Sequence, residues 1–295
     1  MRNCGFIMAI VFSLSLAASG DLIIKYKAQA IVTNRMSFKM KGTYNIAANR
    51  NYCDLTSTFG LIEPREPGAS FDIISNSIIR LDKGVRWSFS GDNGYIEKAI
   101  TSIHDPDSME LVEGYIWSFN AAPIDRKKNF NKLDCRGQIG KATGVNENDP
   151  ADTVFITFEQ WLTEDTLIGA EFVAYWQEFA RVAGAHKMWA QEHMATYMEK
   201  GYGAQCERLS DLMGGPKSLP IKSIITIEKS LLYDRDAELF GEPGKTGGVK
   251  RRGSGMRPEK GGRWKLLHLT NEITGIEQIS IEDSKFEIPP NYEKK

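Results

Sequence analysis

One helical block, from Thr163 to Gly215, interrupts a chain that otherwise has the patterns of β-strands, and this arrangement limits the folds open to it. Within the block the apolar residues recur in steps of four and three, which places them on one stripe of an α-helix. The members of this stripe are Ile168, Phe172, Tyr175, Phe179 and Val182, followed by Trp189 and Tyr197. Thr163 and the two acids after it predict the helix start, and Gly201 and Gly203 predict its end. A shorter helix is expected from Ala204 to Met213.

The segments on both sides of the block alternate apolar and polar residues, as strands with one wet face do. Leu22 to Thr33 shows the alternation clearly. Further strands are expected at Met36 to Ala47, Asn51 to Phe59, Phe71 to Leu81, Val85 to Phe89, Lys132 to Ala142, Thr153 to Leu162, Leu219 to Leu232, Arg263 to Leu269 and Glu272 to Ile281. Ala121 to Pro123 is predicted to be a loop. Nothing resembles the strand-helix alternation of a parallel sheet, so the predicted class is α+β, with an antiparallel sheet curved over helices.

The first twenty residues differ from the rest of the 295-residue chain. Arg2, an apolar run from Phe6 to Ala18 and small residues up to Gly20 are typical of a secretory signal peptide cleaved before Asp21. A membrane anchor is the alternative, but the run is shorter than the roughly 20 residues that span a bilayer. No later stretch is long and apolar enough to span one, so no transmembrane segment is expected in the mature chain.

The composition and the cysteines exclude several classes of function. A formal net charge of -1 gives no reason to expect a nucleic-acid partner. After cleavage Cys53, Cys135 and Cys206 remain, and either one disulfide with any of three pairings or three unpaired thiols fits the sequence. The sequence contains no CxxC motif. Two histidines of the block, His186 and His193, would lie about 10.5 Å apart along a helix, which is too far for both to bind one zinc ion. We expect no metal and no cofactor.

A glycine-rich basic loop is expected from Gly241 to Gly262. Such a loop either is solvated or contacts an anionic surface, such as lipid headgroups, an acidic polysaccharide or a partner protein. The residues that would make that contact are Lys250, Arg251, Arg252 and Arg257.

Short motifs along the chain resemble one known family. The segments are Asp21 to Lys27, Ile79 to Gly84 with Trp87, Asp134 to Arg136, Glu159 to Thr163, Leu219 to Lys222, and Phe286 to Tyr292. In this order they resemble secreted bacterial proteins of the periplasmic lipoprotein-carrier (LolA-like) superfamily and, more narrowly, an uncharacterised branch of it. The resemblance implies one LolA-like domain at residues 21–295, an unclosed half-barrel whose helices cover its concave apolar face, and an acyl-chain cavity in carrier members. It implies no catalytic motif.

The predicted function is therefore that of an exported, non-enzymatic protein, periplasmic or secreted, that shields a lipid or another apolar small molecule between sheet and helices. Aromatic side chains supply contact area and methionines adapt to irregular partners. The residues expected to line the site are Phe172, Trp176, Phe179, Met188, Trp189 and Met194. The same residues would equally form a filled core, in which case the protein would be a cell-envelope interaction module that binds no ligand. A hydrolase with a site assembled from distant residues is the third possibility.

Overall fold

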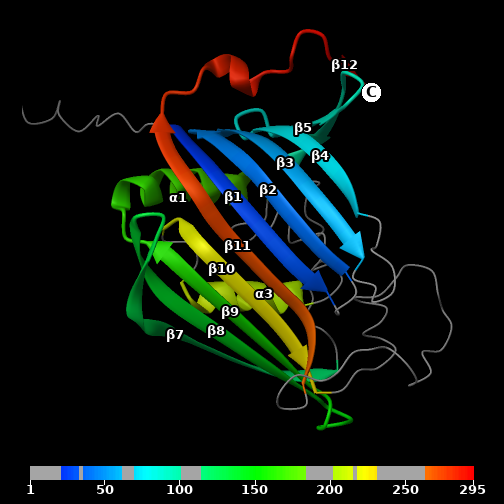
Figure 1. Ribbon diagram of the computed structural model, residues 1–295, viewed down its shortest axis with the longest axis vertical. Helices are drawn as coiled ribbons and strands as arrows, with labels where there is room; N and C mark the ends of the chain where they lie inside the picture. The colour runs from blue at the N-terminus through cyan, green and yellow to red at the C-terminus, as the bar shows by residue number, and fades with distance from the viewer. Residues whose placement is uncertain are drawn as a thin grey trace, which may run out of the picture.

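The computed structural model describes residues 21–32, 36–61, 70–100, 114–183, 202–214, 218–230 and 263–295. Across these residues twelve strands form one sheet (Figure 1). In sequence order they are β1 (Asp21–Val32), β2 (Met36–Ala47), β3 (Arg50–Leu61), β4 (Ser70–Arg80), β5 (Val85–Ser90), β6 (Gly94–Ala99), β7 (Tyr115–Phe130), β8 (Leu133–Asn146), β9 (Thr153–Thr163), β10 (Pro220–Lys229), β11 (Trp264–Ile279) and β12 (Glu293–Lys294).

The order of the strands across the sheet is β12-β6-β5-β4-β3-β2-β1-β11-β10-β9-β8-β7. Neighbours run antiparallel, except for the short parallel pair of β12 with β6. The row ends at β12 and at β7, which do not pair with each other in the described chain, so the sheet is an unclosed half-barrel. This confirms the predicted α+β class.

Of the part of the chain that the structure describes, two helices cover the concave face of the sheet, and they rest on different strands. Helix α1 (Thr166–Ala183) packs against β1 and β2, whereas α3 (Gly203–Leu212) packs against β7, β8 and β9 (Figure 1). None of the described helices combines the length and apolarity needed to cross a bilayer.

Alternation along the strands separates the two faces of the sheet. On β9, Val154, Ile156 and Phe158 are buried beneath the helices, while the residues between them are partly exposed. The opposite, convex face carries ion pairs between neighbouring strands, such as Lys25 with Glu277 at 2.6 Å. One face is therefore apolar and covered, as the sequence pattern predicts.

A second, smaller core lies on the other face, where the C-terminal segment crosses the sheet. The 3-10 helix η3 (Asp283–Phe286) places Phe286 in a cluster with Ala47, Ile78 and Trp87, and its side chain is fully buried. The Arg50 guanidinium lies 4.7 Å from the Phe286 ring centroid. This segment therefore fixes the β2–β5 half of the sheet from outside.

The predicted strands are present with shifts of a few residues at their ends, but three expectations are wrong. Ala121 to Pro123 lie inside β7, where a proline is tolerated because β7 is an edge strand and pairs only with β8 among the described strands. The two strands expected from Arg263 to Ile281 are one, β11. Gly203 begins α3 instead of ending the preceding helix. Residues 1–20, 184–201 and 231–262 lie outside the described residues, and with them the signal peptide, the rest of the helical block and the basic loop.

Candidate apolar ligand site

Helix α1 presents a ladder of aromatic rings to the sheet. The helix begins after Asp165, whose Oδ1 accepts hydrogen bonds from the backbone N–H groups of Leu167 and Ile168 at 3.0 and 3.1 Å. From this start the spacing of four and three aligns the rings of Phe172, Trp176 and Phe179 on one face. These three side chains are buried, and their rings stack with centroids 6.0 and 5.0 Å apart.

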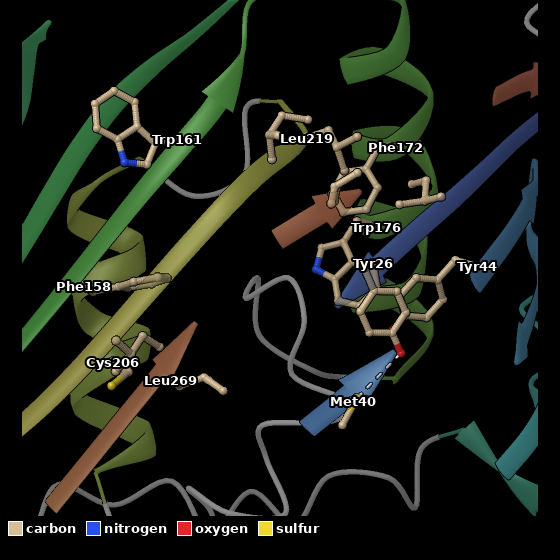
Figure 2. Close-up of a cluster of buried hydrophobic side chains, with 14 of the residues drawn as sticks. Tyr26, Met40, Tyr44, Phe158, Trp161, Phe172, Trp176, Cys206, Leu219 and Leu269 are labelled. Atoms are coloured by element: carbon tan, nitrogen blue, oxygen red, sulfur yellow. Dashed lines mark hydrogen bonds between the residues drawn. The ribbon is translucent and has the colours of Figure 1, made fainter. Parts of the chain in front are cut away.

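The strands beneath α1 add two more rings to the same buried cluster (Figure 2). Tyr26 of β1 and Tyr44 of β2 stack at 4.8 Å, and the Tyr26 hydroxyl lies 3.7 Å from the Met40 sulfur, which accepts its hydrogen bond. Tyr26 is paired across the strands with Gly42, where a Cβ atom would lie 2.8 Å from the Tyr26 hydroxyl oxygen. Only glycine leaves room for the ring to lie across β2.

Helix α3, in contrast, sits directly on the sheet. Its buried apolar residues are Cys206 and Leu209, followed by Met213 just after the helix, and the polar Gln205 and Ser210 are buried with them. Below them β8 has Gly140, where a Cβ atom would lie 3.2 Å from Leu209 Cδ2 and 3.4 Å from Met213 Sδ. The protein itself therefore fills the space under α3, whereas large aromatic side chains form the buried face of α1.

A row of polar residues crosses the middle of this otherwise apolar face. Gln138, Gln160, Ser223 and Asn271 are direct partners on β8, β9, β10 and β11. The Gln138 amide donates to Gln160 Oε1 at 3.1 Å. For Ser223 Oγ and Asn271 Oδ1, both buried, the described chain provides no hydrogen-bond partner. Each such atom costs about 1–3 kcal/mol of stability when left unpaired.

Trp176 also has a buried polar atom without a hydrogen-bond partner, because its Nε1–H has no acceptor among the described residues. In Figure 2 this nitrogen lies on the side of the indole ring away from the α1 ribbon. Buried polar atoms are nearly always hydrogen-bonded in proteins, so such an atom indicates either a bound molecule or a functional cost.

A buried ion pair lies at the C-terminal end of β10, where Lys229 is the last residue of the strand. Lys229 Nζ is 3.2 Å from Asp152 Oδ1, and the two side chains are 3% and 1% exposed. The Tyr115 hydroxyl donates to Asp152 Oδ2 at 2.6 Å, and the Asn146 amide donates to the same oxygen at 3.0 Å. Burial, and then this hydrogen bond to Asp152, raise the pKa of Tyr115. The pair is neutral as a unit and was not foreseen from the sequence.

The three predicted site residues on α1, Phe172, Trp176 and Phe179, thus lie together. Met188, Trp189 and Met194 lie outside the described residues, as do Lys250, Arg251, Arg252 and Arg257. Sequence reasoning missed Ser223 and Asn271, because isolated polar residues in a strand pattern resemble positions on its wet face.

None of the three described cysteines, Cys53, Cys135 and Cys206, forms a disulfide, and all three are buried. Burial raises the pKa of Cys206 to about 12 and that of Cys135 to about 11. The described residues contain no group of three or more histidine, cysteine, aspartate or glutamate side chains that could hold a metal ion.

Comparison with known proteins finds similarity among solved structures alone. No protein-family model and no curated protein matches the sequence. Among solved structures, the crystal structure of the LolA superfamily protein NE2245 from Nitrosomonas europaea matches 92% of this chain and 91% of that chain, with 6% sequence identity and a TM-score of 0.26.

Proposed function

We propose that the protein is an exported, non-enzymatic binding protein that shields a lipid or acyl chain between the concave face of its sheet and helix α1. The observation that supports this most is the way α1 rests on the sheet. Along the helix the rings of Phe172, Trp176 and Phe179 stack on one another, and they belong to the same buried cluster as Tyr26 of β1 and Tyr44 of β2 (Figure 2). Flat rings can shift or rotate to admit a flexible acyl chain. The close packing of α3 on Gly140 leaves no room for one.

The gain on binding would come from removing apolar area from water. Each methylene group buried contributes about 0.8 kcal/mol, so a ligand with ten methylene groups gains roughly 8 kcal/mol before the costs of ordering it. The start of α1 is anchored, because the Ser218 hydroxyl donates to the Thr163 carbonyl at 2.8 Å. The helix would therefore pivot about this end as the ligand enters or leaves.

Export and surface contact belong to the same proposal. Residues 1–20 would direct the chain to the periplasm or the outside and be removed near Gly20, leaving residues 21–295 as one domain. The basic residues of the Gly241 to Gly262 loop, Lys250, Arg251, Arg252 and Arg257, would contact an anionic membrane surface or an envelope protein that delivers the ligand.

The alternative is an envelope interaction module with a filled core. It is favoured by one observation, the burial of Phe172, Trp176 and Phe179 among the protein's own apolar side chains. In that case the aromatic ladder would contribute only stability, and the protein would act through its surface or its open edge strand β7.

Native mass spectrometry of the purified chain, with titration of a fluorescent apolar probe, tests the proposal. We expect co-purifying lipid and saturable probe binding. Trp176→Leu should weaken probe binding about tenfold. The matched control is Leu209→Ala under α3, which should lower stability by about 2–5 kcal/mol without changing the probe affinity of the folded protein. If the wild type carries no lipid and binds no probe, the interaction module is the better account.

A further inference from the structure

The polar row on the concave face contains one pair that the fold does not use. Ser223 of β10 and Asn271 of β11 are directly opposite each other, so both side chains project from the same face of the sheet. They are 7% and 4% exposed. The neighbours two residues away on the same face, Ile221, Ile225 and Leu269, are buried and apolar.

The atoms of this pair are suited to a particular kind of chemical group. Ser223 Oγ can donate and accept a hydrogen bond, and Asn271 Oδ1 accepts one. Both lack a partner among the described residues. Opposed side chains in an antiparallel pair have Cβ atoms about 4.5–5.5 Å apart, a spacing that one hydroxyl or amide group can bridge.

The surroundings favour a neutral group over an anion. Among the described residues the buried charged side chains are Arg80, Asp152 and Lys229. Arg80 pairs with Asp82 and with Glu287, and Lys229 pairs with Asp152. Lys229 is also six residues along β10 from Ser223, about 20 Å away at the rise of an extended strand. A carboxylate or phosphate at the pair would therefore lie without a countercharge among the described residues.

We propose that Ser223 and Asn271 bind the neutral polar group of an amphipathic ligand, a hydroxyl or carboxamide attached to an apolar chain. This inference rests on the proposed function, because the chain of that ligand would lie along the apolar face next to α1. The ligand hydroxyl would donate to Asn271 Oδ1 and accept from the Ser223 hydroxyl. The pair would thus fix one end of the ligand and select it among molecules of equal chain length.

Competition with a fluorescent apolar probe tests the selectivity. The competitors are dodecanol, dodecane and dodecanoate, which share chain length and differ in the end group. We expect the wild type to bind dodecanol about tenfold more tightly than dodecane, which corresponds to about 1.4 kcal/mol, and to bind dodecanoate more weakly than dodecanol. Ser223→Ala and Asn271→Leu should each remove most of the preference for dodecanol over dodecane.

The matched control is Thr226→Ala. Thr226 and His268 are opposed in the same two strands, three residues further along β10 and on the convex face, where Thr226 Oγ1 lies 3.0 Å from His268 Nδ1. This variant should keep the wild-type preference. Thermal unfolding provides the second measurement, and Ser223→Ala should leave the melting temperature unchanged or raise it, because it removes a buried polar atom that has no partner.

The outcomes separate the inference from the function beneath it. If no competitor binds to any variant, the ligand-binding function itself is wrong. If dodecane and dodecanol bind equally well, or dodecanoate binds best, the function stands and the neutral-group site is refuted. If Ser223→Ala and Asn271→Leu change stability but keep the preference for dodecanol, the pair holds only a buried water, and the inference is again refuted.

Discussion

The buried pair of Asp152 and Lys229 gives a prediction whose size follows from its geometry. At 3.2 Å and an effective dielectric constant of about 20, the attraction between the two charges is about 5 kcal/mol. Removing each ion from water costs several kcal/mol, so the intact pair contributes little net stability. Removing one partner is different, because the remaining charge stays buried. We expect Lys229→Met to lower the free energy of unfolding by about 3–5 kcal/mol.

A double-mutant cycle measured by urea unfolding at neutral pH checks this prediction. Lys229→Met and Asp152→Asn should each be costly, while the double variant should lie close to the wild type. The same cycle on the exposed pair of Lys25 and Glu277 is the control and should give a coupling energy below about 1 kcal/mol. The reasoning is refuted if either buried single variant costs less than about 1 kcal/mol, or if the double variant costs as much as the two single variants added together.

Three further predictions concern the strands, the thiols and an acidic side chain. Gly42→Ala should cost about 1–3 kcal/mol in chemical unfolding, because the new Cβ would lie 2.6 Å from a backbone oxygen of β3, whereas Gly275→Ala, with its nearest atom at 3.6 Å, should be tolerated. Thiol reagents should modify Cys135 and Cys206 only after denaturant is added, since burial raises both pKa values; rapid labelling of the native chain would contradict this. The Arg80 guanidinium, which pairs with Asp82, lowers the pKa of the Asp82 carboxyl below 3.8. The stabilising contribution of this carboxylate is therefore present above pH 3.8 and is lost as the pH falls through the folded pKa. Acid unfolding of Asp82→Asn should accordingly depend less on pH below about 4, and an unchanged pH dependence would exclude this role.

Much of the fold can be predicted from the sequence because alternation and helical spacing are local signals. The stripe that begins at Ile168 predicts α1, and the wet-face pattern of Leu22 to Thr33 predicts β1. The errors arise where tertiary context outweighs the local pattern. Pro123 indicates a loop, but an edge strand has no second neighbour that needs its missing N–H. The two strands expected at Arg263 to Leu269 and Glu272 to Ile281 leave Asn271 between them, whereas it is a buried residue in the middle of β11.

The candidate site likewise contains residues that a local pattern reveals and residues that only tertiary contacts bring together. Aromatic residues on one helical face, such as Phe172 and Trp176, are visible in the sequence because their spacing is fixed within one element. The pairing of Ser223 with Asn271 depends on the register between β10 and β11, which no local pattern specifies. The seat of α3 on Gly140 likewise depends on a contact between segments distant in the sequence.

The position of β1 in the sheet has a consequence for how the molecule is made. This strand is synthesised before the other strands of the sheet, yet it lies between β2 and β11, and its first residue, Asp21, is paired with Ile279. Until β11 has been synthesised, one edge of β1 has unpaired backbone hydrogen-bond donors and acceptors next to an exposed apolar surface. Such late, long-range strand pairing makes folding slow and the incomplete chain prone to aggregation. A nascent polypeptide stalled before Trp264 would therefore need a chaperone to prevent its aggregation.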